Sequence, residues 1–168
     1  MTRHGTYEVA LHQGRYFLKL SGHLGFSSSV PFAEIIQVIA DAEECSGTLI
    51  DLLDVDMIDS THLGLIARLA LESQQKLGQQ LTIISTGKHV TQALKTTGLQ
   101  HLALVLDAHQ GEVPTVECIQ SLPVAKQTVA QVMLEAHQTL MSLNQENKSA
   151  YQNVVTMLQS SMHKKGQL

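Results

Sequence analysis

The sequence contains no tryptophan, only three prolines and two cysteines, and just three phenylalanines and three tyrosines. Without a series of aromatic side chains, the chain lacks the stacking platforms with which many proteins hold single-stranded nucleic acid. Its formal net charge of −4 also argues against the basic surface that duplex DNA requires. A nucleic-acid partner is therefore not expected.

Long apolar runs are also missing, since no uninterrupted stretch approaches the roughly 20 apolar residues that cross a bilayer. No signal peptide is recognisable, so we expect a cytoplasmic protein without direct membrane insertion. The cysteines, Cys45 and Cys118, lack a metal-type spacing, and two buried thiols are expected rather than the one possible disulfide. The nine histidines show no short ligand spacing, so neither a metal nor a cofactor is expected.

What the sequence does contain is an alternation of strand and helix patterns. Residues 7–12 and 15–20 alternate apolar and polar side chains around Gln13-Gly14, which predicts a β-hairpin. The elements predicted after it are a helix that starts near Pro31 and ends near residues 45–47, an apolar strand over 48–54, a helix over 61–77, a strand over 81–85, a helix over 88–98 and a strand over 102–106. This order predicts an α/β fold, a mixed sheet with an N-terminal β-hairpin and at least three parallel strands covered by helices.

The composition becomes helical beyond Pro114 and Pro123. From Met133 to Met157, every third or fourth residue fits the a and d positions of a heptad pattern, with Asn147 at an a position as a possible register device. Such a narrow stripe needs a cover, and the pattern leaves two arrangements open. One is a single long helix that pairs with a second copy as a homodimer. The other is a break near residues 143–149 that produces a hairpin, folded on itself or on the sheet.

These patterns divide the chain into an α/β domain over residues 1–112 and a helical extension over residues 113–168. The extension is expected to place His137 on a helix surface.

One short segment between the apolar strand and the next helix concentrates polar side chains. Asp54, Asp56 and Asp59 precede Ser60 and Thr61, which stand in the first turn of the predicted helix. Unpaired backbone N–H groups and the positive end of the helix dipole make such a turn a natural anion site. A simpler interpretation makes Asp59 or Ser60 an N-cap that stabilises the helix by about 1 kcal/mol.

The sequence Asp-Ser-Thr-His-Leu-Gly at residues 59–64 resembles the Asp-Ser-Ser-Gly-Leu-Gly signature of STAS domains, the family of anti-sigma factor antagonists. The resemblance extends over about residues 5–110. It includes the strand, loop and helix before the signature and the strand-helix unit after it. It implies a STAS-like sheet and a binding protein rather than an enzyme.

The resemblance also implies partner switching controlled by a serine kinase that phosphorylates Ser60, with Thr61 as the second choice. The unmodified protein would bind an anti-sigma factor or related regulator, phosphorylation would end the binding, and a serine phosphatase would restore it. A phosphoserine brings about −1.5 to −2 charges, which would repel an acidic partner surface. The residues expected to contact the partner are Asp54, Asp56, Asp59, Ser60, Thr61, His62 and Leu63.

His62 stands where the family carries a small residue. Its bulk could change kinase access or the choice of partner, or its side chain could simply face solvent. It cannot serve Ser60 as a catalytic base, because residues two apart do not face each other on a helix. The rival interpretation of the whole segment is a non-phosphorylated STAS subunit that docks constitutively in a transport or signalling assembly, with Ser60 only as a cap.

Overall fold

The computed structural model describes residues 3–107 and 128–166, and a five-stranded sheet forms its centre. The strands are β1 (Thr6–His12), β2 (Arg15–Leu24), β3 (Gly47–Ile58), β4 (Leu81–Ile84) and β5 (Ala103–Leu106), in that spatial order. β1 runs antiparallel to β2, and all other neighbouring strands are parallel. The predicted α/β class, with an antiparallel hairpin at one edge of a parallel sheet, is confirmed.

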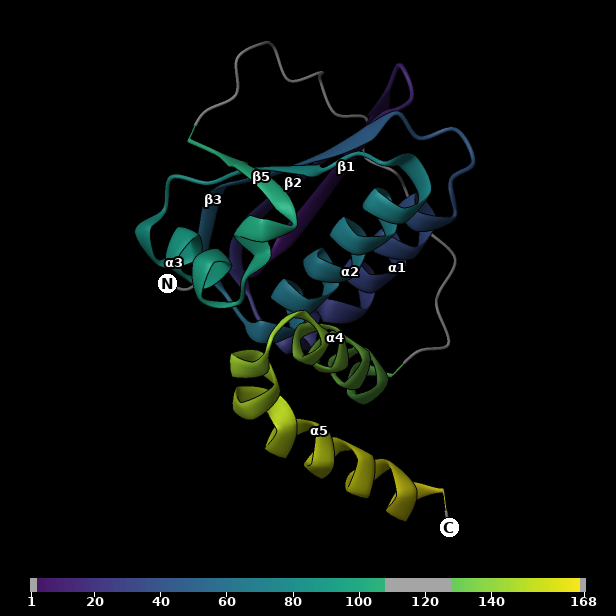
Figure 1. Cartoon of the computed structure of the whole chain (residues 1–168), viewed down its shortest axis with the longest axis vertical. Coiled ribbons are helices and arrows are strands. Elements are labelled where there is room, and N and C mark those ends of the chain that lie inside the picture. Colours follow the sequence, from purple (N-terminus) through teal and green to yellow (C-terminus); the bar gives the residue numbers. More distant parts are fainter. Residues whose placement is uncertain (1–2, 108–127, 167–168) are drawn as a thin grey trace.

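Five α-helices and two short 3-10 turns accompany the strands in the described parts of the chain. They are η1 (Phe26–Ser28), α1 (Ser29–Asp41), α2 (Ser60–Leu77), α3 (Lys88–Thr96), η2 (Leu99–His101), α4 (Val129–Leu143) and α5 (Gln145–Lys165). α1 and α2 lie side by side against the sheet, α4 packs across both of them, and α5 leads away from the body (Figure 1).

Two boundaries differ from the sequence prediction. α1 ends at Asp41 because Ala42 adopts extended backbone (φ −64°, ψ 123°), several residues before the predicted end. β3 continues to Ile58, beyond residue 54, because its last residues keep pairing with β2 across two register shifts. Asp54 and Asp56 therefore lie on a strand rather than in a loop.

Side chains on both faces of β3 are buried, as its nearly continuous apolar sequence predicts. Ile50 is 0% exposed and joins the main core with Phe32 of α1 and Ile66 of α2. Its neighbour Leu49 is 4% exposed and belongs to a smaller cluster on the opposite face. β3 is therefore the central strand, and its C-terminal part continues beyond β4 and pairs with β2.

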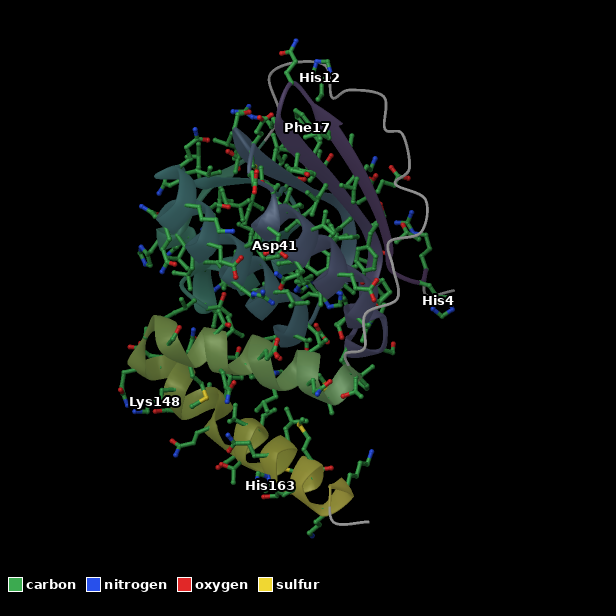
Figure 2. All side chains as sticks on the ribbon, turned by 90° about the vertical axis from the view of Figure 1, so that its right-hand side faces the viewer. His4, His12, Phe17, Asp41, Lys148 and His163 are labelled. Carbon is green, nitrogen blue, oxygen red and sulfur yellow. The ribbon has the colours of Figure 1, made fainter. Side chains whose placement is uncertain are left out.

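Of the two arrangements open for the helical extension, the structure contains the hairpin. Asn144 breaks the helix with extended backbone (φ −162°, ψ 169°), and its side chain caps α5 by accepting the N–H of Asn147 at 2.8 Å. α4 lies between α5 and the rest of the protein (Figure 2) and buries Ala136 and Leu140. Met157, the last residue of the predicted apolar stripe, is 72% exposed on α5.

Of the two cysteines, Cys45 lies in a described part of the chain and is buried, as expected for that thiol. Other predictions concern residues outside the described parts. Cys118, both prolines of the connection and the boundary proposed at residues 112–113 fall in the range 108–127, outside the described residues. None of the helices in the described ranges combines the length and the apolar character needed to cross a bilayer.

The corner of the hairpin is anchored by Asn147, which is 3% exposed. Its Nδ2 donates to the carbonyl of Thr97, after α3, at 2.9 Å and to that of Leu140 at 2.8 Å. The predicted register device is thus a buried side chain, but it joins the hairpin to α3 of the same chain.

We expect Asn147→Ala to lower the free energy of unfolding by about 1–3 kcal/mol, because both hydrogen bonds of a buried amide are lost. Urea denaturation followed by circular dichroism measures this change. Asn153→Ala, at an exposed position of the same helix, is the matched control and should change stability by less than about 0.5 kcal/mol. Equal stability of the two variants would contradict the anchoring role.

Candidate partner-binding and phosphorylation site

The start of α2 is fixed by Asp59, which connects β3 to the helix. Its backbone N–H donates to the carbonyl of Leu24, at the end of β2, at 3.0 Å. Its Oδ1 accepts the backbone N–H of His62 at 2.9 Å, which satisfies one of the unpaired N–H groups of the first turn. Asp59 is therefore the N-cap, and Ser60 is the first residue of the helix.

The ring of His62 points inward and is 0% exposed, so the alternative in which it faces solvent is wrong. Nδ1 donates to Oδ1 of Asp59 at 2.9 Å, and Nε2 lies 2.8 Å from the hydroxyl of Tyr7. The ring also stacks on Phe32, with 5.4 Å between ring centroids. His62 therefore links the cap to β1 and α1 from inside the protein.

Ser60 points toward the helical extension. Its Oγ lies 2.8 Å from Nε2 of His137 in α4, and Nδ1 of the same ring lies 2.6 Å from the carbonyl oxygen of Met133. Because a carbonyl only accepts, Nδ1 carries a proton and donates to Met133, while Nε2 forms the hydrogen bond with the hydroxyl of Ser60. His137 is 3% exposed, so its expected place on a helix surface is wrong.

The seven residues predicted to contact a partner separate into two groups. Thr61, His62 and Leu63 are buried, with exposed fractions of 1%, 0% and 4%. The remaining four are at least partly accessible, Asp54 and Asp56 on β3 and Asp59 and Ser60 at the helix start. A partner that meets this conformation can reach only the second group.

The exposed carboxylates of β3 are paired with basic side chains. Nζ of Lys19 lies 2.8 Å from Asp54, and the guanidinium of Arg3 lies 3.3 Å from Asp56. The hydrogen bond between Lys19 and Asp54 raises the pKa of the lysine and lowers the pKa of the carboxyl. Both pairs are exposed, so a partner with basic groups can compete for these carboxylates at little cost.

An apolar pocket adjoins the acidic pairs at the C-terminal end of β3. Met57 and Ile58 line it from the strand, and His89 and Val90 line it from the first turn of α3. The Met57 side chain is 57% exposed. Together with the carboxylates, the pocket gives this edge of the sheet both charged and apolar contacts, as protein interfaces commonly have.

Within residues 3–107 and 128–166, no cluster of three or more His, Cys, Asp or Glu side chains could hold a metal ion.

Sequence reasoning missed Tyr7 and His137, the two residues that bond the first turn of α2 from distant parts of the chain. They lie 55 and 77 positions from their partners His62 and Ser60. No local spacing signals contacts over such distances. The one usable signal was the polar histidine at position 137, directly after Ala136 on the predicted apolar stripe, since a buried polar ring needs a partner.

Comparison with known proteins identifies the domain. The family model described as the STAS domain matches residues 6–111, and α4 and α5 lie beyond this range. No curated protein matches the chain.

Two solved structures are similar in fold. An anti-sigma factor antagonist from Mycobacterium paratuberculosis has a TM-score of 0.54 and 20% identity, over 62% of this chain and 87% of its own. The Bacillus cell fate determinant SpoIIAA in the phosphorylated form has a TM-score of 0.51 and 11% identity, over 60% of this chain and 91% of its own. At such identities the likeness shows the fold alone.

The buried contact between Tyr7 and His62 leads to a prediction at alkaline pH. Burial raises the pKa of Tyr7 to about 12; the nearby Asp59 carboxylate adds to the rise and the hydrogen bond to Ser28 opposes it. Between pH 10 and 12 the unfolded chain loses this proton while the folded protein keeps it, so the free energy of unfolding must fall as pH rises.

We expect Tyr7→Phe to show a shallower decline of stability over this pH range than the wild type, measured by urea denaturation at closely spaced pH values. Tyr16→Phe and Tyr151→Phe are the comparisons, because burial raises the pKa of both residues by less. A decline unchanged by Tyr7→Phe would show that Tyr7 ionises normally in the folded protein.

Proposed function

Because the chain belongs to the STAS domain family, we propose that it is a partner-switching regulator that binds an anti-sigma factor or related regulator while Ser60 is unphosphorylated. The observation that carries this proposal is the place of Ser60, the first residue of α2, directly after the capping Asp59 and only partly buried. One of the solved structures with a similar fold is that of a protein in a phosphorylated form. Thr61, the second candidate, is 1% exposed and is a poor kinase substrate in this conformation.

The partner surface consists of Ser60, the exposed carboxylates Asp54 and Asp56, and the apolar pocket beside Met57. A phosphate on Ser60 adds about −1.5 to −2 charges to this surface, where the carboxylates of Asp54 and Asp56 are already balanced by Lys19 and Arg3, so it repels acidic groups and obstructs close packing. The implied partners are the regulator, a serine kinase that modifies Ser60 and a serine phosphatase that restores it. The protein acts by binding, in the cytoplasm, and needs no catalytic group of its own.

The first test is peptide mass spectrometry of the protein from its native cells under several growth conditions. Trypsin leaves Ser60 in a long peptide, because no Lys or Arg lies between Lys19 and Arg68. Chymotrypsin, which cleaves after Leu, separates Ser60 from the other serines. We expect phosphate on Ser60 that changes with growth condition.

Substitutions at Ser60 test the consequence for binding. We expect Ser60→Ala to retain the regulator under all conditions, and Ser60→Asp to weaken its recovery by about tenfold or more through charge repulsion. Affinity isolation with quantitative mass spectrometry measures both. Ser161→Asp, at an exposed position of α5, is the control for an added charge and should bind as the wild type does.

Equal binding by Ser60→Ala and Ser60→Asp, with no phosphate in cells, would contradict the switch. It would favour a non-phosphorylated STAS subunit that docks constitutively in a transport or signalling assembly. The hydrogen bond between Ser60 and His137 is the observation that favours this rival, because it gives the hydroxyl a role inside the folded chain.

A further inference from the structure

α4 approaches the first turns of α2 closely enough for their backbones to touch. The contact occurs at Gly64, one turn after Ser60, where a Cβ atom would lie 2.2 Å from the carbonyl oxygen of Ala136. No side chain other than hydrogen fits such a gap. The face of α2 that begins at Ser60 is therefore covered by a helix of the same chain, which lies across it in Figure 1.

The docked face of α4 is apolar except for one residue. Val132, Ala136 and Leu140 are 1%, 1% and 0% exposed, and His137 lies among them at 3%. The ring of His137 meets the edge of Tyr151 from α5, with 5.4 Å between centroids, so both helices of the hairpin enclose it. The hydrogen bond to Ser60 is the polar contact that this ring makes with α2.

That hydrogen bond leaves no room for a larger group on the hydroxyl of Ser60. Oγ of Ser60 lies 2.8 Å from Nε2 of His137, and the ring is 3% exposed. Phosphorylation replaces the hydroxyl proton with a phosphorus atom and three oxygens, and it brings about −1.5 to −2 charges. While α4 is docked, this group cannot take the place of the proton between Oγ and Nε2.

We infer that the α4–α5 hairpin and a phosphate on Ser60 are alternative occupants of the same face of α2, so that phosphorylation releases the hairpin. The inference rests on the proposed function in taking Ser60 as the modified residue. It adds that the chain carries its own competitor for this face. A docked hairpin also holds the Ser60 hydroxyl against His137, so it hinders a kinase from reaching this oxygen.

The test compares purified full-length protein with and without phosphoserine installed at position 60 by genetic encoding. Hydrogen–deuterium exchange of peptides from α4 is the measurement. We expect amides of α4 to exchange about tenfold faster or more in the phosphorylated protein, because the loss of one buried hydrogen bond weakens the docked state by this order. Exchange in β3 should stay unchanged. Unchanged protection of α4 would overturn the inference and show that the phosphate is accommodated with the hairpin in place.

A second pair of variants undocks the hairpin without touching Ser60. Gly64→Ala adds the Cβ that collides with Ala136, while alanine favours the helical conformation of α2 itself. Leu140→Asp undocks the hairpin from the side of α4 and serves if Gly64→Ala disturbs the core, which faster exchange in β3 would reveal. Gly166→Ala, where the nearest atom to the new Cβ is 3.7 Å away, is the matched control.

In Gly64→Ala, we expect α4 to exchange rapidly already, so that phosphoserine at position 60 adds no further increase. In Gly166→Ala, phosphoserine should have its full effect. Equal effects of the phosphate in both variants would mean that it does not act through docking, and this would overturn the inference. These outcomes are independent of the native-cell experiment. Absence of phosphate on Ser60 in cells would contradict the proposed function. Unchanged exchange of α4 would contradict only the competition between the phosphate and the hairpin.

Discussion

Asp59 holds β2, β3 and α2 in one arrangement through three hydrogen bonds. Its backbone N–H closes onto Leu24 of β2, and its Oδ1 accepts both the backbone N–H and the ring Nδ1–H of His62. These contacts determine where β3 ends, where α2 begins and therefore which way each residue of the first turn points. A helix that began one residue later would rotate its side chains by about 100°. Ser60 would then lose its approach to α4.

The two sides of that first turn contact different parts of the protein. Inside, His62 is enclosed by Tyr7 and Phe32 and joins the cap to the sheet and to α1. Outside, Ser60 and Gly64 meet α4, the first through a hydrogen bond and the second through a direct backbone approach. The inner contacts make the position of Ser60 rigid. The outer contacts make its environment dependent on a helix that lies beyond the STAS domain.

This arrangement gives the proposed switch two levels. At the exposed end of β3, Asp54 and Asp56 form ion pairs with Lys19 and Arg3. A phosphate nearby adds negative charge, which repels an acidic partner and attracts a basic one. At the covered face, the proposed phosphate would need the space in which His137 meets Oγ of Ser60. In this proposal the modification acts on an external partner by repulsion and on the internal helix by displacement.

The α/β class, the hairpin edge and the position of α2 follow from the sequence because they depend on local patterns. Examples are the alternation around Gln13-Gly14, the apolar run of β3 and the left-handed Gly78 that closes α2. The resemblance at residues 59–64 likewise identified the family, which the match over residues 6–111 confirms. Periodicity shows which residues share a face, but it does not show what covers that face.

Tertiary structure alone decided that His62 is buried, that the helical extension folds back at Asn144 and that His137 meets Ser60. Each of these depends on contacts between residues far apart in the chain, whose free energy is set by shape and by the pairing of buried polar groups. The sequence by itself determined which segments form helices and strands and where the chain presents a serine at a helix start. The surroundings of that serine were decided only when α4 packed against α2, because Ser60 and the buried imidazole of His137 are far apart in the sequence and meet only in the folded chain.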